Sequence, residues 1–115
     1  MIKVLHHPSC SKSRGVLEYL DENGVAFEVI DYIEEPLSVN ELKALLKKLN
    51  RSVHAIIRKE EMLYTTKYAD RDFSEEEWMA ILAENPELIQ RPILIKGPVA
   101  MIGRPLDNVK YFIDK

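Results

Sequence analysis

Apolar residues recur along the chain with two spacings, one typical of buried strands and one of amphipathic helices. Residues 2–5 are almost continuously apolar and predict a buried strand. Residues 11–22 carry apolar positions on one helical face, and Gly24 supplies the left-handed conformation that often ends a helix. Residues 25–32 are rich in β-branched and aromatic side chains and predict a second strand. Together these segments predict a right-handed βαβ unit with parallel strands.

The middle of the chain has helical spacing, with two similar helix start signals. Residues 38–41 and residues 74–77 are capping boxes, in which a serine oxygen and a glutamate carboxylate accept hydrogen bonds from backbone amides at the helix start. Leucines at helical spacing follow the first box, and Trp78 follows the second. Between the two helices we expect a short helix at residues 53–58 and a mobile, polar connection at residues 59–72.

Two short apolar runs near the carboxyl end, residues 92–96 and 99–102, predict two strands joined by a turn at Gly97-Pro98. An amphipathic helix follows, and four of its side chains are expected to face inward: Leu106, Val109, Phe112 and Ile113. The element order is βαβ, a helical insertion, then ββα. This order predicts one α/β domain over residues 1–115, with a mixed four-stranded sheet and a helical insertion between strands 2 and 3.

Composition and charge exclude several classes of function. With 115 residues, 46% of them hydrophobic and 30% charged, the chain fits a soluble globular domain that folds without disulfide or metal. A net charge of −3 argues against a broad nucleic-acid surface. No window approaches the roughly 20 apolar residues of a membrane span. The amino terminus predicts a strand and not a secretory signal, so we expect a cytoplasmic protein that binds neither nucleic acid nor membrane.

The chain contains one cysteine, Cys10, at the junction of the first predicted strand and the first predicted helix. Unpaired amides and the helix dipole at this position favour the thiolate, and Lys12 and Arg14 add positive charge. The same amides can hold a tetrahedral oxyanion beside the sulfur. The alternative interpretation is a small buried apolar cysteine.

A single cysteine also limits the chemistry of the site. It excludes an intramolecular disulfide and a zinc site made of several thiolates, and the three histidines lack a metal-ligand pattern, so we expect no metal. Ser13 stands where a C-x-x-C pair would carry its second cysteine. An oxidised Cys10 therefore depends on a thiol from outside the chain.

Three arginines far apart in the sequence are candidate anion ligands. Arg58 ends a short apolar run, whereas Arg91 and Arg104 each precede a proline. A residue before proline is restricted to extended geometry, which projects its side chain from the end of an element. Guanidinium groups bind tetrahedral oxyanions through paired, charge-assisted hydrogen bonds. Each arginine taken alone fits a solvated surface charge better than an anion ligand.

The segment His6-His7-Pro8-Ser9-Cys10-Ser11-Lys12-Ser13-Arg14 resembles the H-N-P-x-C-x-x-S-R loop of the glutaredoxin-coupled arsenate reductase family, within the ArsC/Spx superfamily. The resemblance continues through Ile57-Arg58-Lys59, Arg91-Pro92-Ile93 and Gly103-Arg104-Pro105, in the same order over essentially the whole chain. It implies a thioredoxin-like fold with a helical insertion. His7 in place of asparagine, Ser11-Lys12 in place of Gly-Thr, and a shorter carboxyl end indicate a short branch of the family.

The resemblance also implies a role for each matched residue. Cys10 attacks arsenate and forms a covalent thiol–arsenate adduct, and His6 lies near it and assists. Pro92 matches the cis-proline of the fold. Three arginines hold the oxyanion and its developing charge, and two residues of the cysteine loop complete the substrate-binding set. The implied substrate-binding residues are Arg58, Arg91, Arg104, Ser13 and Arg14.

The resemblance further implies that no cofactor is bound, that glutathione is the co-substrate and that glutaredoxin is the partner protein. Two alternatives remain open. One is a glutathione-dependent thiol/disulfide reductase, in which the arginines hold a carboxylate. The other is an Spx-like transcription regulator that binds RNA polymerase. Many Spx proteins carry a C-x-x-C redox switch, which Ser13 interrupts here, and Arg58 and Arg104 fit oxyanion chemistry better.

Overall fold

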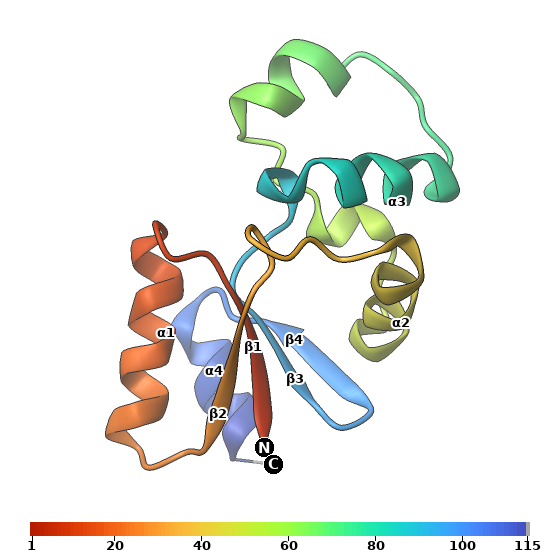
Figure 1. The fold of residues 1–115 in the computed structure, drawn as a ribbon. Coiled ribbons are helices and arrows are strands. Elements are labelled where there is room, and N and C mark those ends of the chain that lie inside the picture. Colours follow the sequence, from red (N-terminus) through yellow and green to blue (C-terminus); the bar gives the residue numbers. More distant parts are fainter. Residues whose placement is uncertain (115) are drawn as a thin grey trace. The chain divides into compact units, whose positions relative to one another are not determined.

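The structure, a computed structural model, describes residues 1–114 and divides into two compact units (Figure 1). The first unit is Met1–Glu35 together with the segment from Arg91 onward, and the second is Pro36–Gln90. All four strands lie in the first unit, and the second contains helices and turns. The expectation of a single domain stays a prediction. No helix among the described residues has the length and apolar character needed to cross a membrane.

A mixed four-stranded sheet forms the centre of the first unit. Its strands are β1 (Ile2–His6), β2 (Phe27–Asp31), β3 (Ile93–Lys96) and β4 (Val99–Ile102), in the spatial order β2-β1-β3-β4. β1 runs parallel to β2 and antiparallel to β3, and β3 runs antiparallel to β4. Val4 of β1 stands opposite Val29 on one side and Leu94 on the other. The predicted mixed sheet is therefore confirmed.

Helices α1 (Ser11–Glu22) and α4 (Leu106–Ile113) cover one face of this sheet (Figure 1). Their apolar side chains form one core with alternate strand residues: Ile2, Val4, Val16, Leu20, Leu94, Val109 and Phe112. Full burial of each such side chain contributes about 1.5–3 kcal/mol, so this core holds the start of α1 in place against the sheet. The expectation that Leu106 faces inward is wrong. Leu106 is 41% exposed, because as the first residue of α4 it lines a surface pocket and not the core.

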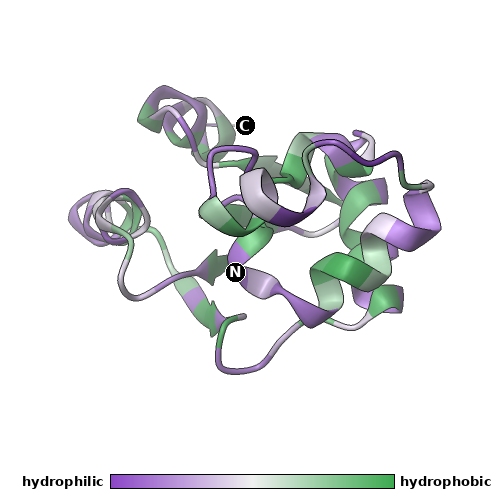
Figure 2. Ribbon diagram, turned by 90° about the horizontal axis from the view of Figure 1, so that it is seen from above, coloured by the Kyte–Doolittle hydropathy of each residue, from purple (hydrophilic) through white to green (hydrophobic). Residues whose placement is uncertain are grey.

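The second unit is built from two helices and three short helical turns. These are α2 (Val39–Leu49), η1 (Val53–Ile56), η2 (Tyr64–Tyr68), α3 (Glu75–Glu84) and η3 (Pro86–Leu88). Both predicted capping boxes are present, with Ser38 and Ser74 as the caps. Green and purple stretches alternate along the helices in Figure 2, as amphipathic helices require, and α2 packs against α3.

The connection expected at residues 59–72 contains a helical turn that was not predicted, and its mobility stays a prediction. The segment contains the π-helical turn Tyr64–Tyr68, and Tyr68 is 7% exposed. The ring of Tyr68 lies 5.8 Å from that of Trp78, and the ring of Phe73 lies 5.2 Å from it. Aromatic pairs at these separations are stabilised beyond the area they bury. These aromatic contacts therefore hold part of a mainly polar segment against α3.

The expected helix at residues 53–58 is present but ends early, as the 3₁₀ turn Val53–Ile56. Ile57 leaves the helix because it pairs with Ile89 in an isolated antiparallel bridge. The amide of Arg58 donates to the carbonyl of Leu88 at 2.7 Å, on one side of this bridge. Long-range backbone pairing therefore places Arg58 within the second unit.

Candidate active site

Cys10 occupies the N-cap position of α1, directly after the loop that follows β1. Its backbone is extended, with φ −92° and ψ 117°. Its amide donates to the carbonyl of His7 at 3.0 Å, and its carbonyl accepts from the amide of Arg14 at 3.0 Å. The tight loop and the first helical turn thus place the thiol at the amino end of α1, and no acidic residue stands in that first turn.

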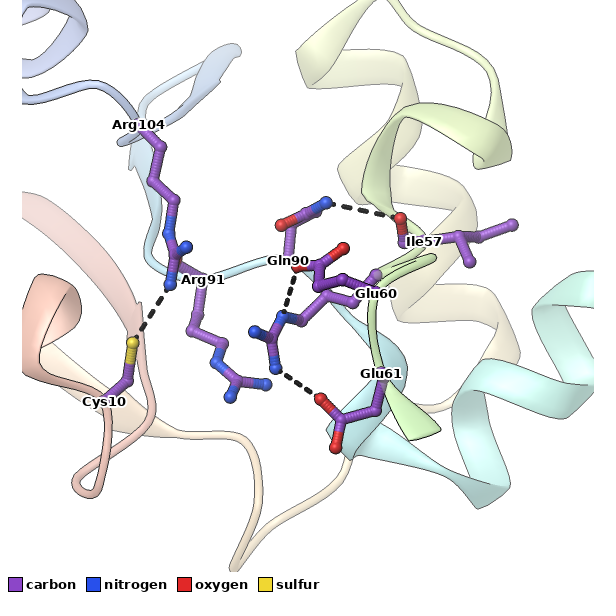
Figure 3. Close-up of polar contacts among 8 residues, drawn as sticks. Cys10, Ile57, Glu60, Glu61, Gln90, Arg91 and Arg104 are labelled. Atoms are coloured by element: carbon purple, nitrogen blue, oxygen red, sulfur yellow. Dashed lines mark hydrogen bonds and ion pairs between the residues drawn. The ribbon is translucent and has the colours of Figure 1, made fainter. Parts of the chain in front are cut away.

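Two guanidinium groups from the far end of the chain reach the Cys10 sulfur. Arg104 Nη2 donates to Cys10 Sγ at 3.0 Å, and the two side chains point toward each other in Figure 3. Arg104 Nε donates to the backbone carbonyl of Arg91 at 2.6 Å, which fixes the orientation of the guanidinium plane. The side chain of Arg91, only 8% exposed as a residue, also interacts with the sulfur. One sulfur therefore faces two cationic groups.

The two Arg-Pro turns that carry these arginines lie side by side. The Arg91–Pro92 and Arg104–Pro105 peptide bonds are both cis. The amide of Gly103 donates to the carbonyl of Pro92 at 2.8 Å, which joins the turns. A Cβ on Gly103 would lie 2.9 Å from Leu94 Cδ1 and 3.0 Å from Pro92 Cγ, so a larger residue here requires these side chains to shift. The cis bond at Pro92 agrees with the resemblance, whereas nothing in the sequence pointed to the second one.

The surroundings of Cys10 favour its thiolate. Burial raises the pKa of the thiol, but the amides of Ser13 and Lys12 and the charges of Arg91 and Arg104 together outweigh burial and hold the pKa below its ordinary value. A lowered pKa enlarges the thiolate fraction near neutral pH, and the thiolate is the nucleophilic form. The site can therefore attack an electrophile and bind an anion at the same place.

A buried polar network lies beneath the cysteine loop. His6 Nδ1 lies 2.6 Å from the hydroxyl oxygen of Ser13, which is fully buried and also accepts from the amide of His7 at 3.3 Å. Burial lowers the pKa of His6, Asp31 opposes this in part, and electrostatic interactions with His7 and Arg14 lower it further. Ser13 thus faces the sulfur through its amide, while its hydroxyl anchors a neutral imidazole.

The sequence matches the ArsC family over residues 5–112. This chain belongs to the ArsC family. The uncharacterized protein YfgD of Escherichia coli K12 is 42% identical over 110 residues, which cover 94% of this chain and 92% of that protein. A Neisseria meningitidis protein named arsenate reductase is 36% identical over 111 residues and 95% of each chain. The solved arsenate reductase from Vibrio cholerae matches with a TM-score of 0.88 and 39% identity, over 96% of this chain and 95% of that one.

Family membership and these structural neighbours confirm the predicted thioredoxin-like fold. Within this ArsC-family fold, Arg14 is exposed, and its Nη1 donates to the carbonyl of Pro8 at 2.9 Å. This hydrogen bond stabilises the loop that precedes Cys10. The part of Arg14 in substrate binding stays a prediction.

Arg58, the third arginine of the ArsC-family pattern, lies in the second unit. Its Nη1 forms an ion pair with Glu61 at 2.7 Å, and its Nε lies 3.3 Å from Glu60. The side chain is 12% exposed, so the two carboxylates hold its guanidinium in one orientation. Its role as an oxyanion ligand stays a prediction.

Sequence reasoning missed the groups that orient two of the candidate arginines, each within its own unit. Glu60 and Glu61 follow Arg58 at a spacing that permits an ion pair within one turn, a signal that was available in the sequence. Asn108 Nδ2 donates to the carbonyl of Arg104 at 2.9 Å and to that of Ile102 at 3.3 Å. Asn108 thereby fixes the backbone of the turn that presents Arg104 to the sulfur. Among the described residues, no cluster of three His, Cys, Asp or Glu side chains is arranged to hold a metal.

Proposed function

We propose that this ArsC-family chain reduces arsenate to arsenite through a covalent adduct on Cys10, with glutathione as co-substrate and glutaredoxin as partner. The observation that carries the proposal is the contact of Arg104 with the Cys10 sulfur at 3.0 Å, beside Arg91 and the amino end of α1. The nucleophilic sulfur and the hydrogen-bond donors that can bind a tetrahedral anion therefore lie side by side. The arsenate reductases among the relatives support arsenate as the substrate.

In the first step, the Cys10 thiolate attacks arsenic and a sulfur–arsenic bond forms. One arsenic–oxygen bond breaks, and its hydroxyl takes a proton from solvent and leaves as water. The donors of Arg91 and Arg104 that face the sulfur in the resting protein bind arsenate oxygens instead. Donors that are already oriented stabilise the charge that develops on these oxygens without reorganisation of solvent. The amides at the start of α1 bind the same anion.

In the second step, the glutathione thiolate attacks Cys10 Sγ, and the sulfur–arsenic bond breaks. The bonding electron pair stays on arsenic, which leaves in the reduced form as arsenite, while Cys10 and glutathione become a mixed disulfide. Glutaredoxin then reduces this disulfide and restores the thiol. Two thiols thus supply the two electrons that arsenate accepts. The use of an outside thiol is supported by Cys10 being the single cysteine of the chain and by Ser13, whose hydroxyl is committed to His6.

Neutral His6 acts as a positioning residue in this scheme. It is 7% exposed, and its Nδ1 is tied to Ser13 in the first turn of α1. The contact joins the end of β1 to the turn that carries the amides around the sulfur. Because the imidazole of His6 is neutral, it supplies no charge to the Cys10 thiolate. The guanidinium groups and the amino end of α1 stabilise the thiolate instead.

The test is arsenite formation from arsenate with glutathione and glutaredoxin, for the natural protein and Cys10→Ser. We expect Cys10→Ser to be inactive and Arg91→Lys to lose most activity, because an ammonium cannot replace the guanidinium fork. Arg71→Lys, at an exposed arginine of the second unit, is the matched control and keeps full activity. Arsenite formation by Cys10→Ser refutes the mechanism. Turnover of glutathione mixed disulfides without any arsenate turnover establishes the thiol/disulfide reductase instead.

A further inference from the structure

A pocket of about 320 Å³ opens on the surface of the first unit beside the reactive sulfur. One wall is the start of α1, and the other is the turn that runs from Gly103 to Leu106. Arg104 lines the pocket and contacts Cys10 at 3.0 Å, so the two sites share a side chain. The volume lies within the range of small-molecule sites.

Gly15 in the wall of this pocket has no explanation in the packing of the protein. It lies in the interior of α1, where glycine costs about 1 kcal/mol relative to alanine. A Cβ at this position would meet no heavy atom within 4 Å, in contrast to the close contacts that a Cβ on Gly103 would make. Glycine is also used where a ligand approaches the backbone closely. The bare backbone of α1 at Gly15 therefore points to an occupant from outside the chain.

The lining shows what chemistry such an occupant has. Val16, Pro105 and half-exposed Leu106 supply an apolar surface, whereas the two charged lining residues, Lys12 and Arg104, are both cations. Among the residues that the structure describes, no acidic side chain lines the pocket. A ligand arm of methylene groups that adjoins a carboxylate matches this distribution.

We propose that this pocket seats the thiol co-substrate, a small peptide thiol of the glutathione class, with one carboxylate beside Lys12 and its backbone against Gly15. The inference rests on the proposed function, in which such a thiol attacks Cys10 Sγ. Seated here, its thiol is held beside the Arg104 side chain that contacts Cys10 Sγ. Binding in the pocket holds the co-substrate thiol near Cys10 Sγ and so raises the effective concentration of the two reacting groups.

Binding is tested first without chemistry. The probe is S-methylglutathione, which cannot react, and the readout is the backbone amide NMR spectrum of the full chain. We expect shifts at the amides of Gly15, Gly103 and Leu106, and none at the exposed Ala44 of α2. The proposal is overturned if S-methylglutathione shifts no amide of the natural protein. It is also overturned if Gly15→Leu shows the same saturating shifts as the natural protein.

Steady-state kinetics gives the second test. Gly15→Leu fills the pocket, and we expect the KM for glutathione to rise by about tenfold or more while the KM for arsenate changes little. Ala44→Leu places the same side chain at an exposed position of α2 and leaves both constants unchanged. An unchanged KM for glutathione in Gly15→Leu overturns the proposal.

A third comparison isolates the carboxylate. The natural protein is expected to use glutathione better than its diester, which lacks both carboxylates, and Lys12→Gln is expected to lose this preference. Lys47→Gln, at an exposed lysine of α2, keeps it. If Lys12→Gln prefers glutathione over the diester as strongly as the natural protein does, the proposed role of Lys12 is contradicted. If arsenate is not reduced with any thiol but S-methylglutathione still shifts the three amides, the proposed function fails and the pocket assignment holds.

Discussion

Arg104 Nη2 lies 3.0 Å from Cys10 Sγ, although 94 positions separate the two residues in the chain. The arginine reaches the sulfur because Gly103 joins its turn to Pro92, Asn108 holds its backbone carbonyl, and its own Nε is bound to the carbonyl of Arg91. Each of these contacts restricts the guanidinium before any substrate arrives. The thiolate and the anion-binding donors are therefore organised together.

Removal of Arg104 should raise the pKa of Cys10. The guanidinium stabilises the thiolate, so in Arg104→Gln the thiol form is favoured to a higher pH. Arsenate turnover should fall by about tenfold or more, since a hydrogen bond from a charged group is worth about 1.5–3 kcal/mol. The measurement is the rate of Cys10 alkylation against pH, whose midpoint should move upward. Arg71→Gln serves as the control, and an identical midpoint in Arg104→Gln contradicts the prediction.

Replacement of Ser13 should destabilise the protein. Ser13→Ala removes the hydroxyl that His6 Nδ1 and the amide of His7 both contact, and it leaves buried polar groups without that partner. The expected loss is about 1–3 kcal/mol in the free energy of unfolding, measured in urea. Ser9→Ala, in the exposed part of the same loop, should change this free energy by no more than about 0.5 kcal/mol. Equal stability of the two variants argues against the buried network.

His6 should make stability depend on pH in a defined direction. Its pKa in the folded protein is lowered, mainly by burial, so the unfolded chain takes up the proton first as the pH falls. Stability should therefore decrease as the pH drops below the ordinary histidine pKa of about 6.5, until the folded-state pKa is passed. His6→Gln should lose less stability on acidification than the natural protein. Urea unfolding from about pH 7.5 to about pH 5.5 tests this, and parallel curves contradict it.

The two glycines that line the pocket should respond to alanine with opposite signs. In Gly103→Ala the new Cβ meets Leu94 at 2.9 Å and Pro92 at 3.0 Å, and overpacking of this kind costs about 1–3 kcal/mol. The displaced turn should also raise the midpoint of Cys10 alkylation, because Arg104 moves with it. Gly15→Ala meets no atom within 4 Å and should stabilise α1 by up to about 1 kcal/mol. Urea unfolding measures both changes, and a neutral Gly103→Ala contradicts the close approach of the two turns.

Several features followed directly from local sequence signals. The capping boxes at Ser38 and Ser74 and the apolar spacing behind them located α2 and α3, because capping and amphipathicity act over a few residues. The same reasoning missed the helical turn within residues 59–72, where the average polarity hid the contacts of Tyr68 and Phe73 with Trp78. It also failed at Leu106, whose helical spacing does not reveal that the first turn of α4 lies at a pocket.

By itself the sequence determined the order and type of most elements and placed Cys10 at the start of a helix, since these depend on local hydrogen bonding and side-chain periodicity. The family resemblance implied that Arg91 and Arg104 lie near the sulfur. Only the tertiary structure shows the contacts that they make there and that the Ser13 hydroxyl contacts His6. These contacts join residues whose separation along the chain says nothing of their separation in space. Sheet pairing and the close packing at Gly103 bring them together, and no local pattern encodes that approach.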